Sequence, residues 1–183
     1  MLTGFGGMRK MTGTEHPSNI VLIGMPGAGK STIGVLLAKQ TSRGFVDTDI
    51  IIQTVHGRSL QDIVDKDGYL TLRKIEEDVL LSLNCHNQVI ATGGSAAYSD
   101  AAMTHLKSDG LIVFLKVELG ILESRIHDYA TRGLAKRADQ SLADLFEERS
   151  VLYRKFADIT VDCRDLTAED VCAMIVREVQ SEK

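Results

Sequence analysis

Short apolar runs alternate along this chain with longer segments in which apolar residues recur every three or four positions. The segments with this helical period cover residues 31–40, 60–64, 70–83, 100–107, 119–129, 142–156 and 168–179. The short runs cover residues 20–23, 44–46, 88–91, 111–115 and 159–161. Several of them are rich in β-branched residues, which is typical of buried parallel strands. This alternation predicts a three-layer α/β fold, in which a five-stranded parallel sheet has helices on both faces.

The residues that precede several of the predicted helices support these boundaries. Ser59, Ser99, Ser141 and Thr167 stand where N-caps belong, because a side-chain hydroxyl there can accept a hydrogen bond from the first turn. Thr167 and Asp170 also have the spacing of a capping box. We therefore expect helices to begin directly after these residues.

The composition is that of an ordinary soluble globular protein. The chain has 183 residues, of which 44% are hydrophobic and 25% are charged. We expect one domain over residues 18–183, and a disordered leader over residues 1–17, which have neither an apolar core nor a helical period. The net charge of −4 argues against nucleic-acid or anionic-membrane partners, and no apolar run has the length of a membrane span. We expect a cytoplasmic monomer whose three cysteines are reduced.

A glycine-rich segment, GMPGAGKST at residues 24–32, joins the first predicted strand to the first predicted helix. It matches the phosphate-binding pattern G-x-x-x-x-G-K-[ST], in which glycines let backbone N–H groups turn inward. The helix that follows adds its positive N-terminal end, Lys30 can reach the outer phosphates, and Ser31 can offer a hydroxyl to Mg²⁺. Because strand and helix flank the segment, nucleotide binding is favoured over a turn without a ligand. The expected nucleotide-binding residues here are Gly27, Ala28, Gly29, Lys30, Ser31 and Thr32.

Two acidic residues follow the second predicted strand, in the sequence FVDTD. Alternate residues of an extended segment share a face, so Asp47 and Asp49 are expected to point together into a cleft at the end of the strand. Phosphoryl transfer needs one carboxylate near the metal ion and another that holds the acceptor hydroxyl. A solvated turn is the alternative, which the position after the second strand of a P-loop domain disfavours.

Two arginines are candidates for binding an anion. Arg73 is followed three and four residues later by Glu76 and Glu77, either of which can brace it. Arg149 falls in the middle of an apolar helical stripe, where a cation is costly unless it has a partner or opens onto a cleft. The pattern leaves two alternatives open for Arg149, a braced ion pair and a ligand-binding arginine.

Two loops complete the candidate site. Gly93 and Gly94 follow the third predicted strand in the sequence TGGS, where they either let backbone N–H groups approach a ligand or form a tight turn. A cationic segment, TRGLAKR at residues 131–137, lies between two predicted helices. Its position and charge are typical of a mobile lid over phosphates, approximately residues 127–140, although an ordinary basic loop would have the same composition.

Together these motifs resemble those of the shikimate kinases. GMPGAGKST, FVDTD, GYLTLRKIEE, TGGS, Arg132 and ERSVLY occur in that family's order and at similar spacing, over about residues 19 to 180. The resemblance implies a P-loop fold of the nucleoside-monophosphate-kinase type with a lid. It also implies Mg²⁺ as cofactor, and transfer of the γ-phosphate of the co-substrate ATP to the 3-hydroxyl of shikimate, a step of aromatic amino-acid biosynthesis.

The resemblance further implies roles for residues at the nucleotide. Lys30 and Arg132 would contact the transferring phosphate and act in catalysis. Ser31 and Asp47 would serve Mg²⁺, the aspartate through water, and Arg125 would lie against the adenine.

At the acceptor, the resemblance implies that Asp49 binds the hydroxyl groups and acts in catalysis. Arg73, Arg149 and the backbone of Gly93 and Gly94 would hold the carboxylate end of a small hydroxy acid.

Several positions depart from the family's pattern: Val64, Tyr69, Leu72, Ser95, Gly133 and Val151. The charged contacts are kept, whereas the apolar walls of the acceptor pocket are changed. Two alternatives therefore stay open. One is a kinase of another polyhydroxy acid such as gluconate. The other is a nucleotide-binding regulatory protein that has lost catalysis, which is disfavoured because every charged residue of the pattern is present.

Overall fold

The computed structural model describes residues 17–125 and 133–181. Its centre is a parallel sheet with the strand order β2-β3-β1-β4-β5. The strands are β1 (Asn19–Ile23), β2 (Gly44–Asp47), β3 (Gln88–Ala91), β4 (Gly110–Lys116) and β5 (Ile159–Asp162). Each differs from its predicted range by at most one residue at either end. β1 pairs with both β3 and β4, with Ile20 opposite Val89 on one side and Leu111 on the other. The predicted five-stranded parallel sheet is confirmed.

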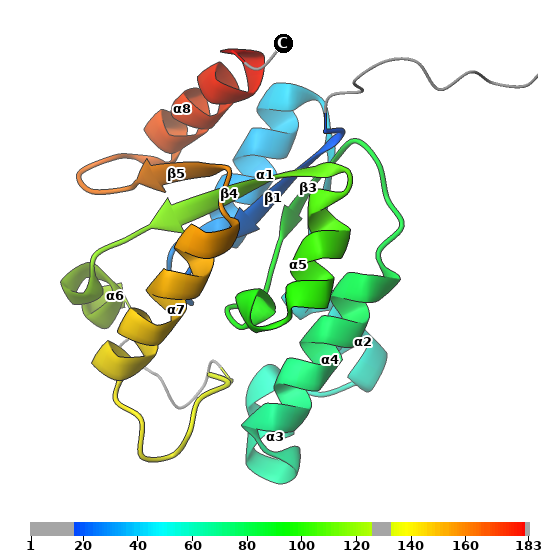
Figure 1. The fold of residues 1–183 in the computed structure, drawn as a ribbon, viewed down its shortest axis with the longest axis vertical. Coiled ribbons are helices and arrows are strands. Elements are labelled where there is room, and N and C mark those ends of the chain that lie inside the picture. The colour runs from blue at the N-terminus through cyan, green and yellow to red at the C-terminus, as the bar shows by residue number, and fades with distance from the viewer. Residues whose placement is uncertain (1–16, 126–132, 182–183) are drawn as a thin grey trace, which may run out of the picture.

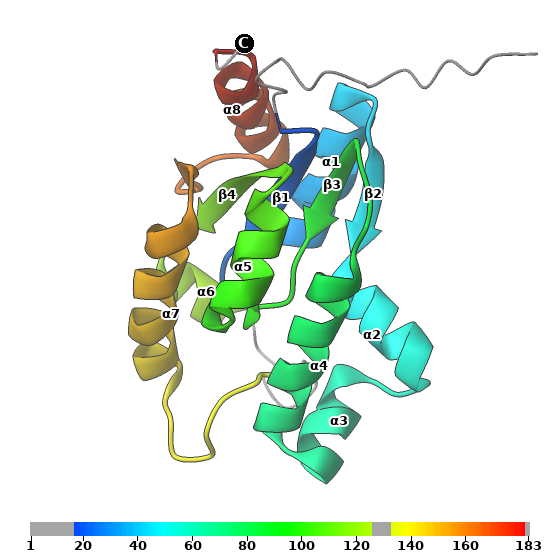
Figure 2. The same cartoon turned by 45° about the vertical axis from the view of Figure 1, so that its right-hand side comes forward.

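Helices cover both faces of this sheet (Figure 1). α1 and α8 pack together on one face, and α5 and α7 lie on the opposite face. α2, α3 and the adjoining end of α4 extend beyond the carboxyl ends of β2 and β3 (Figure 2). The helices are α1 (Lys30–Thr41), α2 (Thr48–His56), α3 (Leu60–Asp67), α4 (Tyr69–Ser82), the 3₁₀ helix η1 (Ala96–Tyr98), α5 (Asp100–Lys107), α6 (Leu119–Arg125), α7 (Leu142–Phe156) and α8 (Ala168–Ser181).

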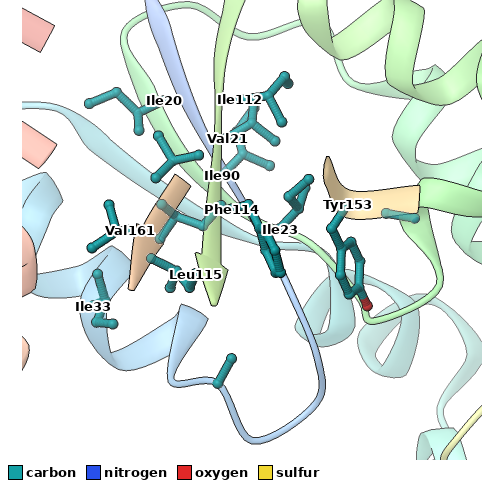
Figure 3. Close-up of a cluster of buried hydrophobic side chains, with 14 of the residues drawn as sticks. Ile20, Val21, Ile23, Ile33, Ile90, Ile112, Phe114, Leu115, Tyr153 and Val161 are labelled. Atoms are coloured by element: carbon teal, nitrogen blue, oxygen red, sulfur yellow. The ribbon is translucent and has the colours of Figure 1, made fainter. Parts of the chain in front are cut away.

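The core lies on both faces of the central strands (Figure 3). β1 is buried over its whole length, as a strand covered on both sides should be. Leu115 and Val161 point toward Ile33 of α1, whereas Phe114 points toward Tyr153 of α7. The rings of Phe114 and Tyr153 are 5.1 Å apart between centroids. This packing fixes α1 and α7, and with them the residues that each helix contributes to the site.

The predicted caps are confirmed. The side chains of Ser59, Ser99 and Ser141 each accept a hydrogen bond from the first turn of the helix that follows. Thr167 and Asp170 form the reciprocal pair of a capping box. The Ser and Thr residues of the sequence therefore correctly predicted where α3, α5, α7 and α8 begin.

The structure corrects the prediction in one segment and leaves others untested. α2 was not predicted, because its sequence TDIIIQTVH has consecutive β-branched residues, which favour strands. The predicted helix over residues 119–129 is described only as far as Arg125. The predicted leader lies outside the described residues except for residue 17. Within the described residues, no helix has both the length and the apolar character needed to cross a membrane.

Candidate active site

The glycine-rich loop follows β1 at the carboxyl edge of the sheet, where parallel α/β folds bind ligands. Gly24 has φ of 147°, and a Cβ there would lie 2.8 Å from the backbone oxygen of Leu115, so only glycine fits. Gly29 has φ of 89° and is the N-cap of α1, with no side chain capping the helix. The first N–H groups of α1 are thus available to bind an anion.

A cavity of about 610 Å³ opens above this loop, a volume in the usual range for small-molecule sites. It is lined by Pro26, Gly27, Gly29, Lys30, Ser31, Thr32, Asp49, Gln53, Ser59, Leu60, Thr92 and Arg125. The cavity thus brings together most of the residues predicted to bind the nucleotide. Ala28 is buried instead, and its N–H donates to the oxygen of Met25 over 3.0 Å. Arg132 lies outside the described residues.

Lys30 is buried and folds back onto its own loop. Its Nζ donates hydrogen bonds to the backbone oxygens of Gly24, over 2.9 Å, and of Met25, over 3.0 Å. Burial lowers the pKa of Lys30 to about 8, and the nearby carboxylate of Asp49 opposes this effect. Phosphate oxygens would stabilise the charged form further, so the site contains a buried cationic donor that suits an anion.

Ser31 and Asp47 lie side by side at the mouth of the loop. The Ser31 hydroxyl donates to Oδ2 of Asp47 over 2.6 Å. Oδ1 of Asp47 accepts from the N–H groups of Asp49 and Ile50, and so caps α2. The two acids therefore do not share one extended segment as predicted: β2 ends at Asp47, and Asp49 stands in the first turn of α2. The two residues are held close together because Asp47 caps the helix in whose first turn Asp49 stands.

The hydroxyl and the carboxylate of this pair fit Mg²⁺. Magnesium ions in phosphotransfer sites are held by few protein oxygens together with water and substrate phosphates. In the described part of the chain, no group of three or more His, Cys, Asp or Glu side chains could form an all-protein metal site. The Ser31–Asp47 pair thus matches a metal ion that arrives with a nucleotide.

Two carboxyl groups meet at Gly93, that of Asp49, which lines the cavity, and that of Glu76, which is buried. A Cβ on Gly93 would lie 2.9 Å from Oδ1 of Asp49 and would collide with Oε1 of Glu76, which explains the glycine. Burial raises the pKa of Asp49. Burial and the nearby Asp49 raise the pKa of Glu76 to about 8. Sequence reasoning considered Glu76 only as a brace for Arg73 and missed its proximity to Asp49.

Arg73 and Arg149 converge on one backbone oxygen. Nη2 of Arg73 donates to the oxygen of Ala135 over 3.1 Å, and Nη2 of Arg149 donates to the same oxygen over 2.9 Å. Arg149 is only 1% exposed, and neither arginine forms an ion pair within the described residues. Glu77, the other predicted brace, pairs with Lys74 instead. The braced ion pair expected as one alternative for Arg149 is therefore absent there.

Gly94 lies between Arg149 and Pro26 of the glycine-rich loop. A Cβ on Gly94 would lie 2.8 Å from Nη1 of Arg149 and 2.7 Å from Cγ of Pro26. Its oxygen accepts a hydrogen bond from the Tyr153 hydroxyl over 2.6 Å. Gly93 thus lies beside Asp49, and the adjacent Gly94 lies beside Arg149. The two glycines therefore connect the predicted hydroxyl-binding residue to a predicted carboxylate-binding residue.

Buried side-chain atoms that lack a hydrogen-bond partner gather in this region. Within the described residues they are Asp49 Oδ1, Arg73 Nε, Glu76 Oε2, Ser95 Oγ, Gln140 Oε1 and Arg149 Nε. Native proteins leave few buried polar atoms unpaired. A cluster of them beside a cavity is expected where a polar ligand or bound water completes the hydrogen bonding.

The departures from the family's pattern fall into different environments. Val151 is 62% exposed on α7, so this change does not alter the site's lining. Leu72 is fully buried in a small cluster with Ile52, Ile63 and Ala135, against which Val64 also packs. Val64 also lines a cavity with Tyr69 and Leu134, so the space beside this cluster is not filled.

Gly133 has a structural requirement of its own. Its φ is 60°, its N–H donates to Oε1 of Gln61 over 2.8 Å, and a Cβ there would lie 2.5 Å from the backbone of Leu60. Glycine at this position lets the segment from residue 133 pack directly on α3. Tyr69 and Ser95, the remaining departures, both lie near Arg73: the Tyr69 ring contacts its guanidinium, and Ser95 lines a small cavity with it.

Comparison with known proteins agrees with this geometry. The family model described as shikimate kinase matches residues 26–180. A shikimate kinase of Thermodesulfovibrio yellowstonii is 36% identical over 165 residues, which cover 88% of this chain and 95% of the relative. The solved structure of a shikimate kinase from Acinetobacter baumannii in complex with shikimate superposes with a TM-score of 0.83 at 32% identity, covering 92% of this chain and 96% of that one.

A more distant structure extends the comparison to the fold alone. Thymidylate kinase from Candida albicans superposes with a TM-score of 0.54 at 14% identity, covering 91% of this chain and 92% of that one. The described architecture is thus the three-layer P-loop fold of the nucleoside-monophosphate-kinase type.

Proposed function

The chain belongs to the shikimate kinase family, and from this premise we propose that it transfers the γ-phosphate of ATP to the 3-hydroxyl of shikimate. Each part of this reaction has a counterpart among the residues of the site. The reaction forms a bond between the hydroxyl oxygen and the γ-phosphorus, breaks the bond from that phosphorus to the β–γ bridging oxygen, and releases ADP and a proton.

The cavity beside the glycine-rich loop binds ATP. Free N–H groups at the start of α1 and Nζ of Lys30 face the phosphates, and Lys30 exchanges its two backbone acceptors for phosphate oxygens. Arg125 ends α6 at the cavity and lies against the base, its Nη1 being 3.4 Å from the oxygen of Gly27. Arg132 contacts the transferring phosphate from the lid, as the resemblance implies.

Ser31 and Asp47 would hold the Mg²⁺ that accompanies ATP, the aspartate through water as the resemblance implies, and their oxygens already lie side by side. When bound, the ion neutralises charge on the phosphates during transfer. The protein's own contribution is to fix these oxygens at the start of α1 and the end of β2.

Asp49 binds the acceptor hydroxyl and takes up its proton. Its Oδ1 is buried without a partner, and the raised pKa of its carboxyl is suited to accepting a proton. Arg73 and Arg149 hold the acceptor's carboxylate, with the Gly93–Gly94 backbone between the two ends. The carboxylate binds the two guanidinium groups where the oxygen of Ala135 now accepts their hydrogen bonds.

The observation that carries the proposal is the convergence of two guanidinium groups on one oxygen, in a region that also contains Asp49. A guanidinium matches a carboxylate through two parallel hydrogen bonds. The acceptor is therefore a small molecule with a hydroxyl at one end and a carboxylate at the other.

The test is a coupled assay of ADP release with a panel of hydroxy acids. Shikimate is expected to be phosphorylated at its 3-hydroxyl, as seen in the product by NMR, whereas gluconate and quinate are expected to give little turnover. Shikimate carboxamide serves as the matched control, because it keeps the hydroxyls and lacks the carboxylate. If the carboxamide were phosphorylated as well as the acid, the arginines would not bind the carboxylate. If gluconate were the better substrate, the shikimate assignment would be wrong.

A further inference from the structure

The guanidinium of Arg73 is held by aromatic rings rather than by a carboxylate. Its central carbon lies 3.6 Å from the centroid of the Tyr98 ring and 5.2 Å from that of the Tyr69 ring. Glu76 and Glu77, at the spacing at which a helical carboxylate can brace an arginine, form no ion pair with it. A contact at 3.6 Å is a direct stacking contact, which is a favourable arrangement for arginine on an aromatic face.

The Tyr98 ring is fixed in position by its own contacts. Its hydroxyl donates to Oε1 of Glu148 in α7 over 2.7 Å, and Oε2 of Glu148 accepts from Gln140 over 2.6 Å. The same ring lies 5.5 Å from the guanidinium of Arg149. Tyr98 ends η1, four residues after Gly94, so the segment that brings the two glycines to the site also carries the ring.

Stacking leaves the edge of a guanidinium free, whereas a carboxylate partner would occupy it. A carboxylate would also neutralise the positive charge and so weaken the attraction for a second anion. Within the described residues, Arg73 donates a hydrogen bond to the oxygen of Ala135, and its Nε is buried without a partner. Arg73 thus keeps its charge and most of its donors for a ligand.

We propose that Tyr98 is a positioning residue of the acceptor site, whose ring holds Arg73 by its face and keeps the guanidinium edge turned toward the acceptor's carboxylate. This inference rests on the proposed function, because it takes Arg73 to bind the acceptor. Tyr69, whose ring is farther from Arg73, makes the weaker of the two contacts.

The test compares Tyr98→Leu, which removes the ring, with Tyr98→Phe, which keeps the ring and removes the hydrogen bond to Glu148. Tyr98→Leu is expected to raise the KM for shikimate about tenfold, with the KM for ATP unchanged, because the lost stacking lets the guanidinium turn away. Tyr98→Phe should stay within about twofold of wild type, since the ring still covers Arg73. Equal losses in both variants would overturn the inference, because the hydroxyl and not the ring would then matter.

A double-mutant cycle separates positioning from general structural damage. In an Arg73→Met background, Tyr98→Leu should have no further effect on the shikimate KM, because the group that it positions is gone. Additive effects of the two substitutions would overturn the inference. Tyr98→Met, whose longer and more flexible side chain can adapt to the space of the ring, replaces Tyr98→Leu in the cycle if the latter does not fold.

One readout is independent of turnover. The side-chain NMR signals of Arg73 should be shifted upfield by the ring current of Tyr98 in wild type and in Tyr98→Phe, and not in Tyr98→Leu. Unshifted signals in wild type would overturn the inference. Absence of shikimate phosphorylation by wild type would overturn the proposed function instead, so the two failures are distinguishable.

Discussion

Lys30 is the residue whose change should affect the chemistry most directly. It is buried, its Nζ donates to two backbone oxygens of its own loop, and phosphate oxygens would stabilise its charged form. Lys30→Ala removes this preorganised contact, and we expect turnover to fall by about 10²–10³. Steady-state kinetics and thermal unfolding of the same preparation provide the measurement. Turnover within a few-fold of wild type, in a protein of unchanged stability, would refute the assignment of the phosphate-binding loop.

A substitution of Arg149 tests whether this residue binds the carboxylate of the acceptor. It is 1% exposed and has the oxygen of Ala135 as its hydrogen-bond partner. Lysine keeps the charge but cannot make two parallel hydrogen bonds to a carboxylate. Arg149→Lys is therefore expected to raise the shikimate KM by about tenfold or more and to leave the ATP KM almost unchanged. Arg154→Lys on the exposed side of the same helix is the matched control. A variant that lost stability but bound shikimate normally would show that Arg149 is only structural.

Glu76 is expected to make the free energy of unfolding depend on pH. The pKa of its carboxyl is raised from 4.5 to about 8 by burial and by the nearby Asp49. Between these values the folded protein keeps a proton that the unfolded chain has released, so the free energy of unfolding falls as the pH rises. Each unit of pKa difference corresponds to about 1.4 kcal/mol.

The variant Glu76→Gln lacks this titration and should show a flatter profile. Urea unfolding of the unliganded protein from pH 5 to pH 8 gives the comparison, and the variant is expected to be the more stable of the two at pH 8. A residual slope from Asp49, whose pKa is also raised, has the same sign. Parallel profiles for the two proteins would mean that Glu76 is ionised throughout this range.

For single residues, the sequence indicates which side chains belong to the candidate site, but it does not indicate which of them are in contact. Motif order indicated Lys30, Asp49, Arg73 and Arg149 as candidate site residues, since each type of side chain suits the binding of a phosphate, a hydroxyl or a carboxylate. It did not indicate that the arginines meet at the oxygen of Ala135 or that Tyr98 covers Arg73. Such contacts depend on the packing of segments far apart in the chain, which no local period encodes.

Among the elements, α2 shows where local reasoning failed. Ile50, Ile51 and Ile52 in succession favour a strand, and only the last of them is buried. The signals that decide the helix were nevertheless present. Asp47 caps its first turn, and Gly57, with φ of 62°, ends it. The missed helix also changed the site, because it turns Asp49 into the cavity from a helical turn and not from an extended strand.

The next prediction depends on the segment predicted to form a lid. Residues 133–135 pack on α3 and on the two acceptor arginines, whereas Arg132 itself lies outside the described residues. If Arg132 acts on the transferring phosphate, its contact is made chiefly in the transition state. Arg132→Ala should then lower kcat by about a hundredfold or more and weaken ATP binding much less.

The measurement for Arg132→Ala combines steady-state kinetics with direct titration of a non-hydrolysable ATP analogue. Arg137→Ala, in the exposed part of the same segment, is the control and should keep near-normal kcat. A loss confined to ATP affinity would instead make Arg132 a ground-state contact with the nucleotide.

For the whole molecule, the order of the strands explains why distant motifs form one site. β1 lies next to β3, and β2 lies on the other side of β3, so the loops after these strands meet at one edge of the sheet. Those loops carry the phosphate-binding glycines, Asp47 and the Gly93–Gly94 pair. α7 then packs against β4 and η1 and brings Arg149 to the same place. The predicted parallel sheet places these segments at the same edge, because parallel strands have their carboxyl ends together, whereas the strand order that makes them neighbours was not predicted.

The site described here is assembled from a single chain, and we expect the protein to act as a monomer. In the part of the chain that the structure describes, the exposed large apolar residues are scattered over several helices: Val35, Ile50, Val55, Leu70, Leu81, Val151 and Met174. Isolated apolar residues are normal on a soluble surface, whereas a stable dimer needs a large continuous interface. Light scattering during gel filtration should give the mass of one chain, and kcat per chain should not change over a hundredfold range of protein concentration. A fall in kcat on dilution, reversed by concentrating the sample, would show that the active form is an oligomer.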